Sequence, residues 1–498
     1  MSAPLASAPG AVRRAPLVHA PWTADWFRGD ATLAAIFGAP PTAASLAASA
    51  GAQAARPRTD WTRWLCAASG HAPPADALAV LAGQQPVLAG GAALVAHKAA
   101  TAVRLARDLS RELGRPVVPV FLLADEDHDS AEIDHVDVID EATGALRRVR
   151  CPLSPRSARF RDAAWDVDRL SQAIAEVATV PQEHQHAFRA RHSHLEASPV
   201  TEHVIALLLE AFGEHGLVCL QAHRLTHAGT TILEAALADT RWTSRELAAG
   251  GERLAGAGLP VSFDPFDPRP LVLESTDLRR RRVAAGDDKA LRRFAANADV
   301  FSPQAALRPV VQAAALPVVA QVCGPSELLY LGQARALHER FGLAPPVLVP
   351  RLEATRLTAR QLRELGADLA AVDLRDAARH AHPLAAEERA LEEAATRLAE
   401  GVAALAPALA ARARRWREQS ARTAHRLAES PHWHNQRGST FTVLRPRGRA
   451  QDTVLAWLPD AWRAGRPAAW GARITELCRP LEPPEHVLHV LPEESAHG

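Results

Sequence analysis

Lysine, tyrosine and methionine are almost absent from this chain of 498 residues. It has one tyrosine and one methionine, and only Lys98 and Lys289 among its 57 basic residues are lysines. The chain uses arginine and tryptophan where other proteins use lysine and tyrosine. A lysine or tyrosine that is nevertheless present indicates a position at which arginine or tryptophan could not replace it. Lys98 follows a glycine-rich loop at 83–91, and Tyr330 follows a second loop at 323–327. Both are candidates for a functional site, although a tyrosine packed in the core and a lysine on a helix surface are the structural alternative.

An excess of charge and long apolar runs are also lacking. The chain has 57 basic and 56 acidic residues, a formal net charge of +1, so no bulk field draws nucleic acid or an anionic membrane. No apolar run approaches the ~20 residues that span a bilayer. The stretch 1–21 has no sustained apolar core and is not expected to be a signal peptide. A hydrophobic content of 48% with 23% charged residues is typical of a folded protein.

Cysteines are few, odd in number and widely spaced. None of the five lies in C-x-x-C spacing, which excludes a zinc ribbon and a dithiol redox motif. We therefore expect a reducing compartment and a cytoplasmic protein. Cys323 is expected to be a small packing residue, because nothing adjacent in the sequence lowers its pKa.

Two similar units predict an α/β fold. An apolar run at 78–81 precedes the glycine-rich loop, helical periodicity covers 92–113 up to Gly114, and a second apolar run covers 117–123. Pro116 and Pro119 favour a first half that lies at an edge of the sheet or at its entry point. Such strand–helix–strand units place their strands in parallel.

The second unit has a strand at 316–322, a tight loop, a helix from Ser326 as N-cap to Phe341, and a strand at 347–349. A further strand is predicted at 217–220. Together the patterns predict a Rossmann-like, mainly parallel sheet with insertions. Short basic runs such as 279–282 are interpreted as solvated helix faces.

The densest group of titratable side chains directly follows the strand at 117–123. Ligand sites in open α/β sheets lie beyond the carboxyl ends of the strands, so this position favours a functional role. Carboxylates and imidazoles could act there as general acid and base, or could bind a metal ion, and a solvated acidic turn is the plain alternative. The group consists of Asp125, Glu126, Asp127, His128, Asp129, Glu132, Asp134 and His135.

Polar residues of the two loops are candidates for ligand binding. Gly83, Gln84 and Gln85 precede one helix, but their spacing matches neither a P-loop nor a dinucleotide fingerprint. The second loop contributes Gly324, and Glu327 and Tyr330 share a helix face three residues apart.

Two arginines lie next to these units, Arg308 shortly upstream of the strand at 316–322, with Gln312 nearby, and Arg351 after the strand at 347–349. Either guanidinium could bind a carboxylate bidentately or form a structural ion pair.

The region 383–430 has a different character. Leu384, Leu391, Leu398 and Leu405 recur every seven residues, which predicts a coiled coil. Pro407 favours a second helix through 416–427. An ordinary helical hairpin is the alternative to a protruding coiled coil that pairs two chains. Strands are expected again at 441–444 and 486–491. The chain thus divides into a core at 1–382, a helical segment at 383–430 and a segment at 431–498 that returns to the core.

These motifs, in this order, resemble those of the bacillithiol biosynthesis cysteine-adding enzymes, the BshC family. The resemblance is carried by motifs that run through most of the chain. They are Gly83-Gln84-Gln85 with Lys98, 117–121, Glu126-Asp127-His128-Asp129 with His135, 301–303, Leu307-Arg308-Pro309 with Gln312, Gly324-Pro325 with Glu327 and Tyr330, 349–351, and Gln451 with 454–455.

The resemblance implies a Rossmann-like core, a coiled coil that supports homodimers, and a ligase that joins the carboxyl group of L-cysteine to the amino group of glucosaminyl malate. It further suggests ATP as the cosubstrate that activates the carboxyl group. In that reading Asp127 or His128 is the base, Arg308 or Arg351 holds the malate carboxylates, and Gln84, Gln85 and the helix N-termini hold cysteine or a nucleotide. The rivals are a metal-dependent hydrolase or deacetylase built on Asp127, His128, Asp129 and His135, and a non-catalytic dimeric scaffold.

Overall fold

The structure is a computed structural model. It describes residues 11–17, 20–56, 60–70, 72–140, 145–154, 159–178, 199–238, 241–263, 272–276, 279–283, 287–358, 361–362, 385–406, 449–464 and 466–491, with isolated positions at 409, 412–413, 416–417, 419–420, 423, 444 and 446. Within these ranges, no helix is both long enough and apolar enough to cross a membrane.

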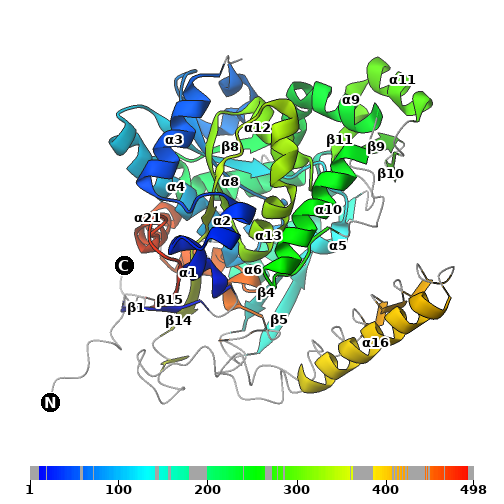
Figure 1. Cartoon of the computed structure of the whole chain (residues 1–498). Helices are drawn as coiled ribbons and strands as arrows, with labels where there is room; N and C mark the ends of the chain where they lie inside the picture. Colours follow the sequence, from blue (N-terminus) through cyan, green and yellow to red (C-terminus); the bar gives the residue numbers. More distant parts are fainter. Residues whose placement is uncertain are drawn as a thin grey trace.

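A five-stranded parallel sheet forms the centre of the molecule (Figure 1). Its strands are β2 (Leu78–Gln84), β3 (Val117–Leu123), β8 (Val218–Gln221), β12 (Val318–Cys323) and β13 (Val347–Pro350). The order is β13-β12-β2-β3-β8, and every neighbouring pair is parallel. The predicted Rossmann-like sheet is therefore confirmed, with each of these strands within three residues of its expected limits.

Strand β3 shows how the sheet accommodates proline. All seven of its residues are buried. It pairs with β2 along its whole length, but with β8 only from Val120 onward. The segment 117–119 therefore has a neighbour on one side only, which is where Pro119, without an N–H, is tolerated. The expectation that the first half lies at an edge is confirmed.

Helices cover both faces of the sheet. Alternate residues of β2 enter opposite cores: Leu78 and Val80 pack with α4 (Ala93–Leu113), α8 (Val200–Phe212) and α21 (Pro467–Leu477). Ala79 and Leu81 pack on the other side with α9 (Thr230–Ala238) and α12 (Arg308–Ala315). Burial of strands from both faces explains their continuous apolar sequence.

The second predicted unit differs from expectation at its helix. Helix α13 spans Pro325–Ala334, and a 3-10 segment, η10 (Arg335–Phe341), continues it to Gly342, whose φ is 62°. The predicted N-cap, Ser326, is wrong: the N-cap is Gly324. The fixed φ of Pro325 suits the first helical position, and Glu327 accepts a hydrogen bond from the N–H of Gly324.

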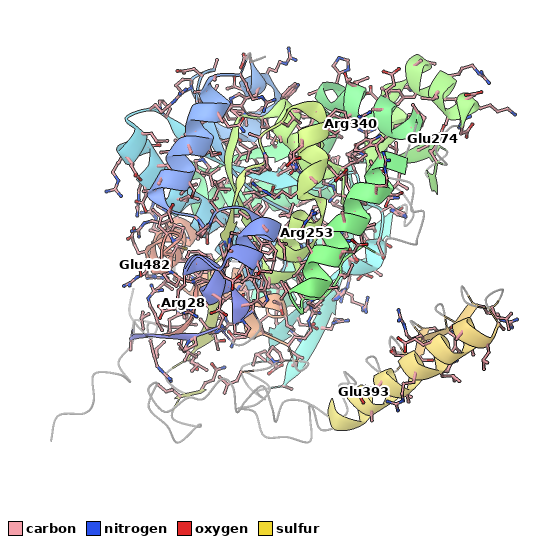
Figure 2. The ribbon with its side chains drawn as sticks, in the orientation of Figure 1. Arg28, Arg253, Glu274, Arg340, Glu393 and Glu482 are labelled. Carbon is pink, nitrogen blue, oxygen red and sulfur yellow. The ribbon has the colours of Figure 1, made fainter. Side chains whose placement is uncertain are left out.

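Insertions form small satellite sheets. A hairpin of β4 (His135–Ile139) and β5 (Leu146–Arg150) follows α5 (Ser130–Ile133), and β6 (Leu153–Ser154) pairs with β7 (Ala164–Trp165). Strand β9 (Val272–Thr276) pairs with β10 (Arg279–Arg282) and β11 (Phe301–Pro303). The basic run 279–282 is thus a strand, and its assignment to a helix face is wrong. Arg293 of α11 (Asp288–Ala296) donates to Glu274 of β9 at 2.6 and 3.0 Å, and this ion pair holds the helix against the insertion. Glu274 is labelled in Figure 2.

Segments from the two ends of the described chain meet in a further, three-stranded sheet. Strand β15 (Glu485–Val490) lies between β1 (Val12–Pro16), antiparallel to it, and β14 (Glu353–Leu357), parallel to it. The predicted strand at 486–491 is confirmed; most of the one predicted at 441–444 lies outside the described residues.

The remaining helical elements complete the described structure. The α-helices are α1 (Trp22–Phe27), α2 (Ala31–Phe37), α3 (Ala43–Ala54), α6 (Val167–Ala178), α10 (Arg241–Gly256) and α20 (Leu458–Arg463). The 3-10 turns are η2 (Trp61–Trp64), η3 (Ala67–Ser69), η4 (Leu88–Gly90), η5 (Phe160–Asp162), η7 (Gly213–His215), η8 (Ala222–Gly229), η9 (Ala298–Val300) and η13 (Gln451–Thr453).

The heptad region contains one long described helix, α16 (Ala385–Leu405), drawn apart from the central sheet in Figure 1. Three of its heptad leucines are exposed, Leu391 by 47%, Leu398 by 55% and Leu405 by 90%. Most of the second helix expected at 416–427 lies outside the described residues.

Candidate functional site

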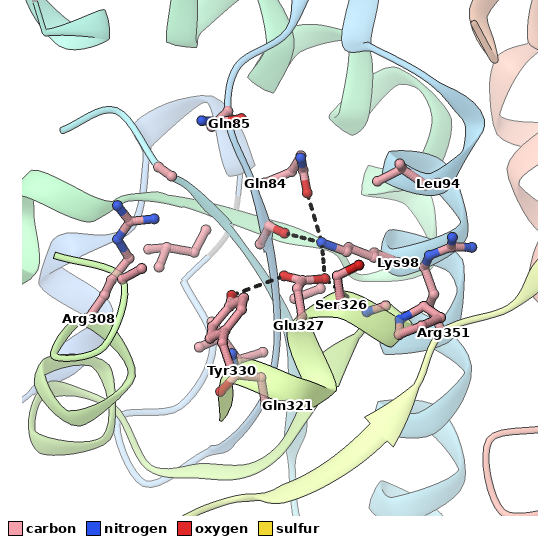
Figure 3. A pocket seen from close by; sticks show the side chains of 18 of the residues that line it. Gln84, Gln85, Leu94, Lys98, Arg308, Gln321, Ser326, Glu327, Tyr330 and Arg351 are labelled. Carbon is pink, nitrogen blue, oxygen red and sulfur yellow. Dashed lines mark hydrogen bonds and ion pairs between the residues drawn. The ribbon is translucent and has the colours of Figure 1, made fainter. Parts of the chain in front are cut away.

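A cavity of about 440 Å³ opens at the carboxyl ends of β2, β3 and β12 (Figure 3). Parallel strands present ligand sites at this edge. Segments from both predicted units meet there. Its lining consists of Leu81, Ala82, Gly83, Gln84, Gln85, Leu94, Lys98, Leu122, Ala124, Asp127, Ala305, Arg308, Gln312, Gln321, Gly324, Pro325, Ser326, Glu327, Tyr330, Arg351, Arg449 and Thr453.

Lys98 forms the hub of the cavity wall. Its side chain is only 2% exposed, and Nζ donates to the carbonyl oxygen of Gly83 at 2.9 Å and to Oε1 of Gln84 at 2.8 Å. Nζ also lies 2.5 Å from Oε2 of Glu327. A buried ammonium with three oxygen partners has its donors satisfied and its charge compensated. Lys98 therefore connects the end of β2 to the start of α13.

Glu327 connects Lys98 to Tyr330. Its Oε2 accepts from the Gly324 N–H at 2.8 Å, and its Oε1 lies 3.5 Å from the Tyr330 hydroxyl. Burial, together with the adjacent Glu327 carboxylate, raises the pKa of Tyr330 well above its ordinary value. Tyr330 is thus a neutral donor at the cavity wall at physiological pH. Figure 3 shows its hydroxyl directed toward Glu327.

The glycine-rich loop contributes only its beginning to the cavity. Gly83, Gln84 and Gln85 line it, whereas Gly90 turns to the C-terminal segment and accepts a 3.0 Å hydrogen bond from Nε1 of Trp457. Gly90 has a φ of 78°, and a Cβ there would lie 2.8 Å from the Trp457 ring. Glycine is required at this position for packing, not for approach to a ligand.

The acidic group is divided between the cavity and its surroundings. Asp127 lines the cavity and accepts from Nε2 of Gln85 at 3.0 Å. Gln85 also donates to Glu132 at 2.5 Å. His128 has a 43% exposed side chain, 3.5 Å from Asp127, and is not part of the lining. Asp127 is therefore the member of the group that the structure brings together with Lys98 and Tyr330.

The other members of the group contact different partners. Glu126 is buried and lies 3.3 Å from Nη1 of Arg161. Asp129 caps α5 through the Ala131 N–H. His135 starts β4 and lies 2.8 Å from Asp134, and burial lowers its pKa. None of these three lines the cavity.

The hydrogen-bonded pair of Asp125 and His223 was not predicted from the sequence. Asp125 is fully buried and accepts from both the backbone N–H of His223, at 3.0 Å, and its Nδ1, at 2.5 Å. The partner comes from η8, almost 100 positions later, and no local pattern marks it.

Arg308 and Gln312 project from α12 into the cavity. The Arg308 guanidinium has no hydrogen bond or ion pair with another described residue, and Figure 3 shows it across the cavity from Arg351. Gln312 is 7% exposed, and its Oε1 is buried without a partner among the described residues. Because unpaired buried polar atoms are costly, these two side chains are suited to a polar ligand.

Arg351 is almost fully buried beside the start of α13. Its Nη1 donates to Asp452 at 2.6 Å and to the carbonyl oxygen of Leu352 at 2.7 Å. Although burial opposes its charge, Asp452 and Glu353 raise the pKa of Arg351. The same ion pair, with His97, holds the pKa of Asp452 well below its usual range against the opposing effect of burial.

The C-terminal segment supplies lining residues that sequence reasoning missed. Arg449 and Thr453 line the cavity, and Asp452 lies between them in sequence. The motif with Gln451 pointed to this neighbourhood, but not to individual side chains. Their position depends on the return of the chain to the core.

The charges on the wall favour an anionic ligand. Four lining residues are cationic, Lys98, Arg308, Arg351 and Arg449, and two are acidic, Asp127 and Glu327. The lining thus has a net charge of about +2 near neutral pH. Among the residues that the structure describes, no three His, Cys, Asp or Glu side chains are grouped so that they could hold a metal ion.

Most residues that line the cavity lie in a part of the chain that matches a known protein family. The family model for the N-terminal Rossmann-like domain of the bacillithiol biosynthesis protein BshC matches residues 73–352, more than half of the chain. These residues include most of the lining; Arg449 and Thr453 lie beyond them.

Curated relatives agree. Proteins named "Putative cysteine ligase BshC" are 30% identical over 303 residues in Koribacter versatilis, 31% over 317 in Geobacillus thermodenitrificans and 32% over 301 in Thermus thermophilus. The matches cover 55–58% of this chain and 55–57% of each relative, so the chain spans a little over half the length of the curated relatives it matches. The match to the domain model shows that this chain belongs to the BshC family.

Proposed function

We propose that this protein is a ligase that forms an amide bond between the carboxyl group of L-cysteine and the amino group of glucosaminyl malate. The observation that carries the proposal is the single cavity in which Asp127, Lys98, Glu327, Tyr330 and the cationic wall meet. The name of the relatives, cysteine ligase, supports the same reaction class.

The chemistry of amide formation fits the lining. The acceptor amine has to lose a proton before it attacks, and Asp127 is the carboxylate on the wall that can take it. Negative charge develops on the carboxyl oxygen during attack, and the net positive charge of the wall stabilises it. Lys98, whose three N–H donors are already used, holds that wall in place. Arg308 is free to bind a carboxylate of the malyl group.

The activation of the cysteine carboxyl group is assigned to ATP in this proposal. The cationic wall that suits carboxylates also suits phosphate oxygens, since both are bound by charge-assisted hydrogen bonds. Comparison of turnover with and without ATP tests this assignment directly.

The proposal extends to assembly and location. The exposed leucines of α16 support a coiled coil that pairs two chains as a homodimer. Light scattering after gel filtration should give twice the chain mass, and Leu398→Glu should shift it to one chain mass. All five cysteines are free, which suits the cytoplasm.

The decisive experiment is product formation. Purified protein incubated with L-cysteine, glucosaminyl malate and ATP should yield a thiol-containing condensation product, detected by mass spectrometry. The Lys98→Met variant, which removes the hub of the wall, should yield none. A wild-type protein of native fold that gives no such product, with or without ATP, contradicts the proposal.

A further inference from the structure

Arg351 is held by one edge of its guanidinium only. Nη1 makes both of its hydrogen bonds, to Asp452 at 2.6 Å and to Leu352 at 2.7 Å, while Nε and Nη2 donate to no described residue. The side chain is 4% exposed and lines the cavity. The Nε–Nη2 edge is the one that binds a carboxylate through two parallel hydrogen bonds.

The free edge lies against the start of α13. A Cβ added at Gly324 would lie 3.3 Å from Nε of Arg351 and 3.5 Å from Oε2 of Glu327. Glycine therefore leaves space next to Nε, and Figure 3 shows Arg351 next to Ser326 at this place. A carboxylate that binds there meets a guanidinium already ordered in the protein, which lowers the entropic cost of binding.

Asp452 is the residue that orders it. The carboxylate is fully buried, and its Oδ2 lies 2.6 Å from Arg351, 3.3 Å from Nδ1 of His97 and 3.3 Å from the backbone nitrogen of Ala354. It belongs to η13 of the C-terminal segment, outside the matched Rossmann-like domain. The C-terminal segment therefore fixes the orientation of a side chain that lines the cavity.

We propose that Asp452 is a positioning residue that fixes Arg351 so that its Nε–Nη2 edge binds a carboxylate of a substrate. The inference rests on the proposed function for the identity of the substrates, cysteine and glucosaminyl malate. Both contain carboxylates, and kinetics with each substrate varied separately tells which one Arg351 holds.

The chain offers a matched control. Asp460 forms a second buried ion pair, with Arg356, that also joins the C-terminal segment to β14, but neither partner lines the cavity. Asp452→Asn and Asp460→Asn therefore each remove a buried carboxylate that pairs with an arginine, and both are expected to lower the Tm. Only Asp452→Asn should raise the KM of one substrate, on the order of tenfold, with kcat changed less than threefold.

A double variant tests whether Asp452 acts through Arg351. Arg351→Gln should raise the same KM, and adding Asp452→Asn to it should cause no further rise. Calorimetry with L-malate and L-cysteine as probes repeats the comparison without turnover. The probe that wild type binds should lose about tenfold in affinity in Asp452→Asn and little in Asp460→Asn.

The possible results are distinct. Equal effects of Asp452→Asn and Asp460→Asn on KM, independent effects of Asp452→Asn and Arg351→Gln, or no binding of either probe to the wild type would each overturn the inference. Wild-type binding without product formation removes the proposed function and leaves the calorimetric comparison to decide the role of Asp452.

Discussion

The Nζ atom of Lys98 lies 2.5 Å from Oε2 of Glu327, and this ion pair joins the two strand–helix units of the fold. Lys98 comes from α4, after the first loop, and Glu327 from the first turn of α13, after the second. The pair fixes the distance between the two helices at the cavity wall. It also explains why a chain with two lysines keeps one here: a compact ammonium places three oxygens around a single nitrogen, whereas a guanidinium is planar and spreads its donors over three nitrogens.

Glu327→Gln should be strongly destabilising. It leaves the Lys98 ammonium buried without a counter-charge, which costs roughly 3 kcal/mol in comparable cases. Urea unfolding followed by circular dichroism measures the loss. The double variant Lys98→Met/Glu327→Gln should recover part of that stability, because it removes both charges. A single variant as stable as wild type would mean that the pair is not buried in solution.

Arg308→Gln should raise the KM for glucosaminyl malate by about tenfold to a hundredfold, since a charge-assisted bidentate contact is lost. The KM for cysteine should change little. Steady-state kinetics with each substrate varied in turn provides the measurement. The control is Arg473→Gln, because Arg473 is exposed on α21 and does not line the cavity. Both KM values should remain unchanged in this variant.

Asp127→Asn should lower kcat by about 10²–10⁴-fold, the usual contribution of a general base. His128→Ala should cost far less, because its side chain is exposed and does not line the cavity. Single-turnover rates at saturating substrates separate the two. The assignment of the base would move to the imidazole if His128→Ala were the more damaged variant.

Most of the sheet was predictable because burial on both faces leaves a continuous apolar run in each strand. The runs at 78–81, 117–123 and 347–349 all proved to be strands of the central sheet. The start of α13 was predicted less well. Ser326 is a good N-cap in isolation, but Pro325 and Glu327 together move the start of the helix to Gly324. Gly324, Pro325 and Glu327 together determine where the helix starts, and their combined geometry is not apparent from any one of them.

The cavity was predictable in part. Gln84, Lys98, Glu327 and Tyr330 lie in loops and first turns at the carboxyl ends of strands, so topology alone brings them close. Arg449 and Asp452 were not predictable in this way. Their segment reaches the cavity because it packs against residues that are 100 or more positions earlier in the sequence, such as His97 and Arg351. No local sequence pattern encodes such contacts.

The folded protein should lose stability in acid through His338. Burial lowers the pKa of this ring to about 4. Below pH 6.5 the unfolded chain binds a proton that the folded chain does not, so stability present above that pH is lost as the pH falls toward 4. Between pH 7 and pH 4.5 the loss amounts to about 2 kcal/mol.

His338→Gln should remove that part of the pH dependence, as measured by urea unfolding at the two pH values. His227→Gln, at an exposed position, serves as the control and should retain the wild-type dependence. An unchanged pH slope in His338→Gln would show that the ring is solvated in the native state.

The thiols should be unreactive in the native state. All five are free and buried, and burial raises the pKa of Cys323 well above its ordinary value. Ellman's reagent at pH 8 should therefore label less than one thiol per chain before denaturation and five afterwards. Cys323→Ala should keep its turnover. Fast labelling of Cys323 with parallel loss of activity would give this residue a chemical role.

The pairing of β1 with β15 has a consequence for how the polypeptide reaches its final form. Among the strands that the structure describes, residues 12–16 pair only with 485–489. They therefore leave the ribosome long before their partner is synthesised. During most of synthesis β15, the partner of β1, has not yet been made. Pairing between strands so distant in sequence is slow and prone to misassembly. A nascent chain stalled before residue 485 should leave its leading strand open to proteases and chaperones, even with the central sheet already formed.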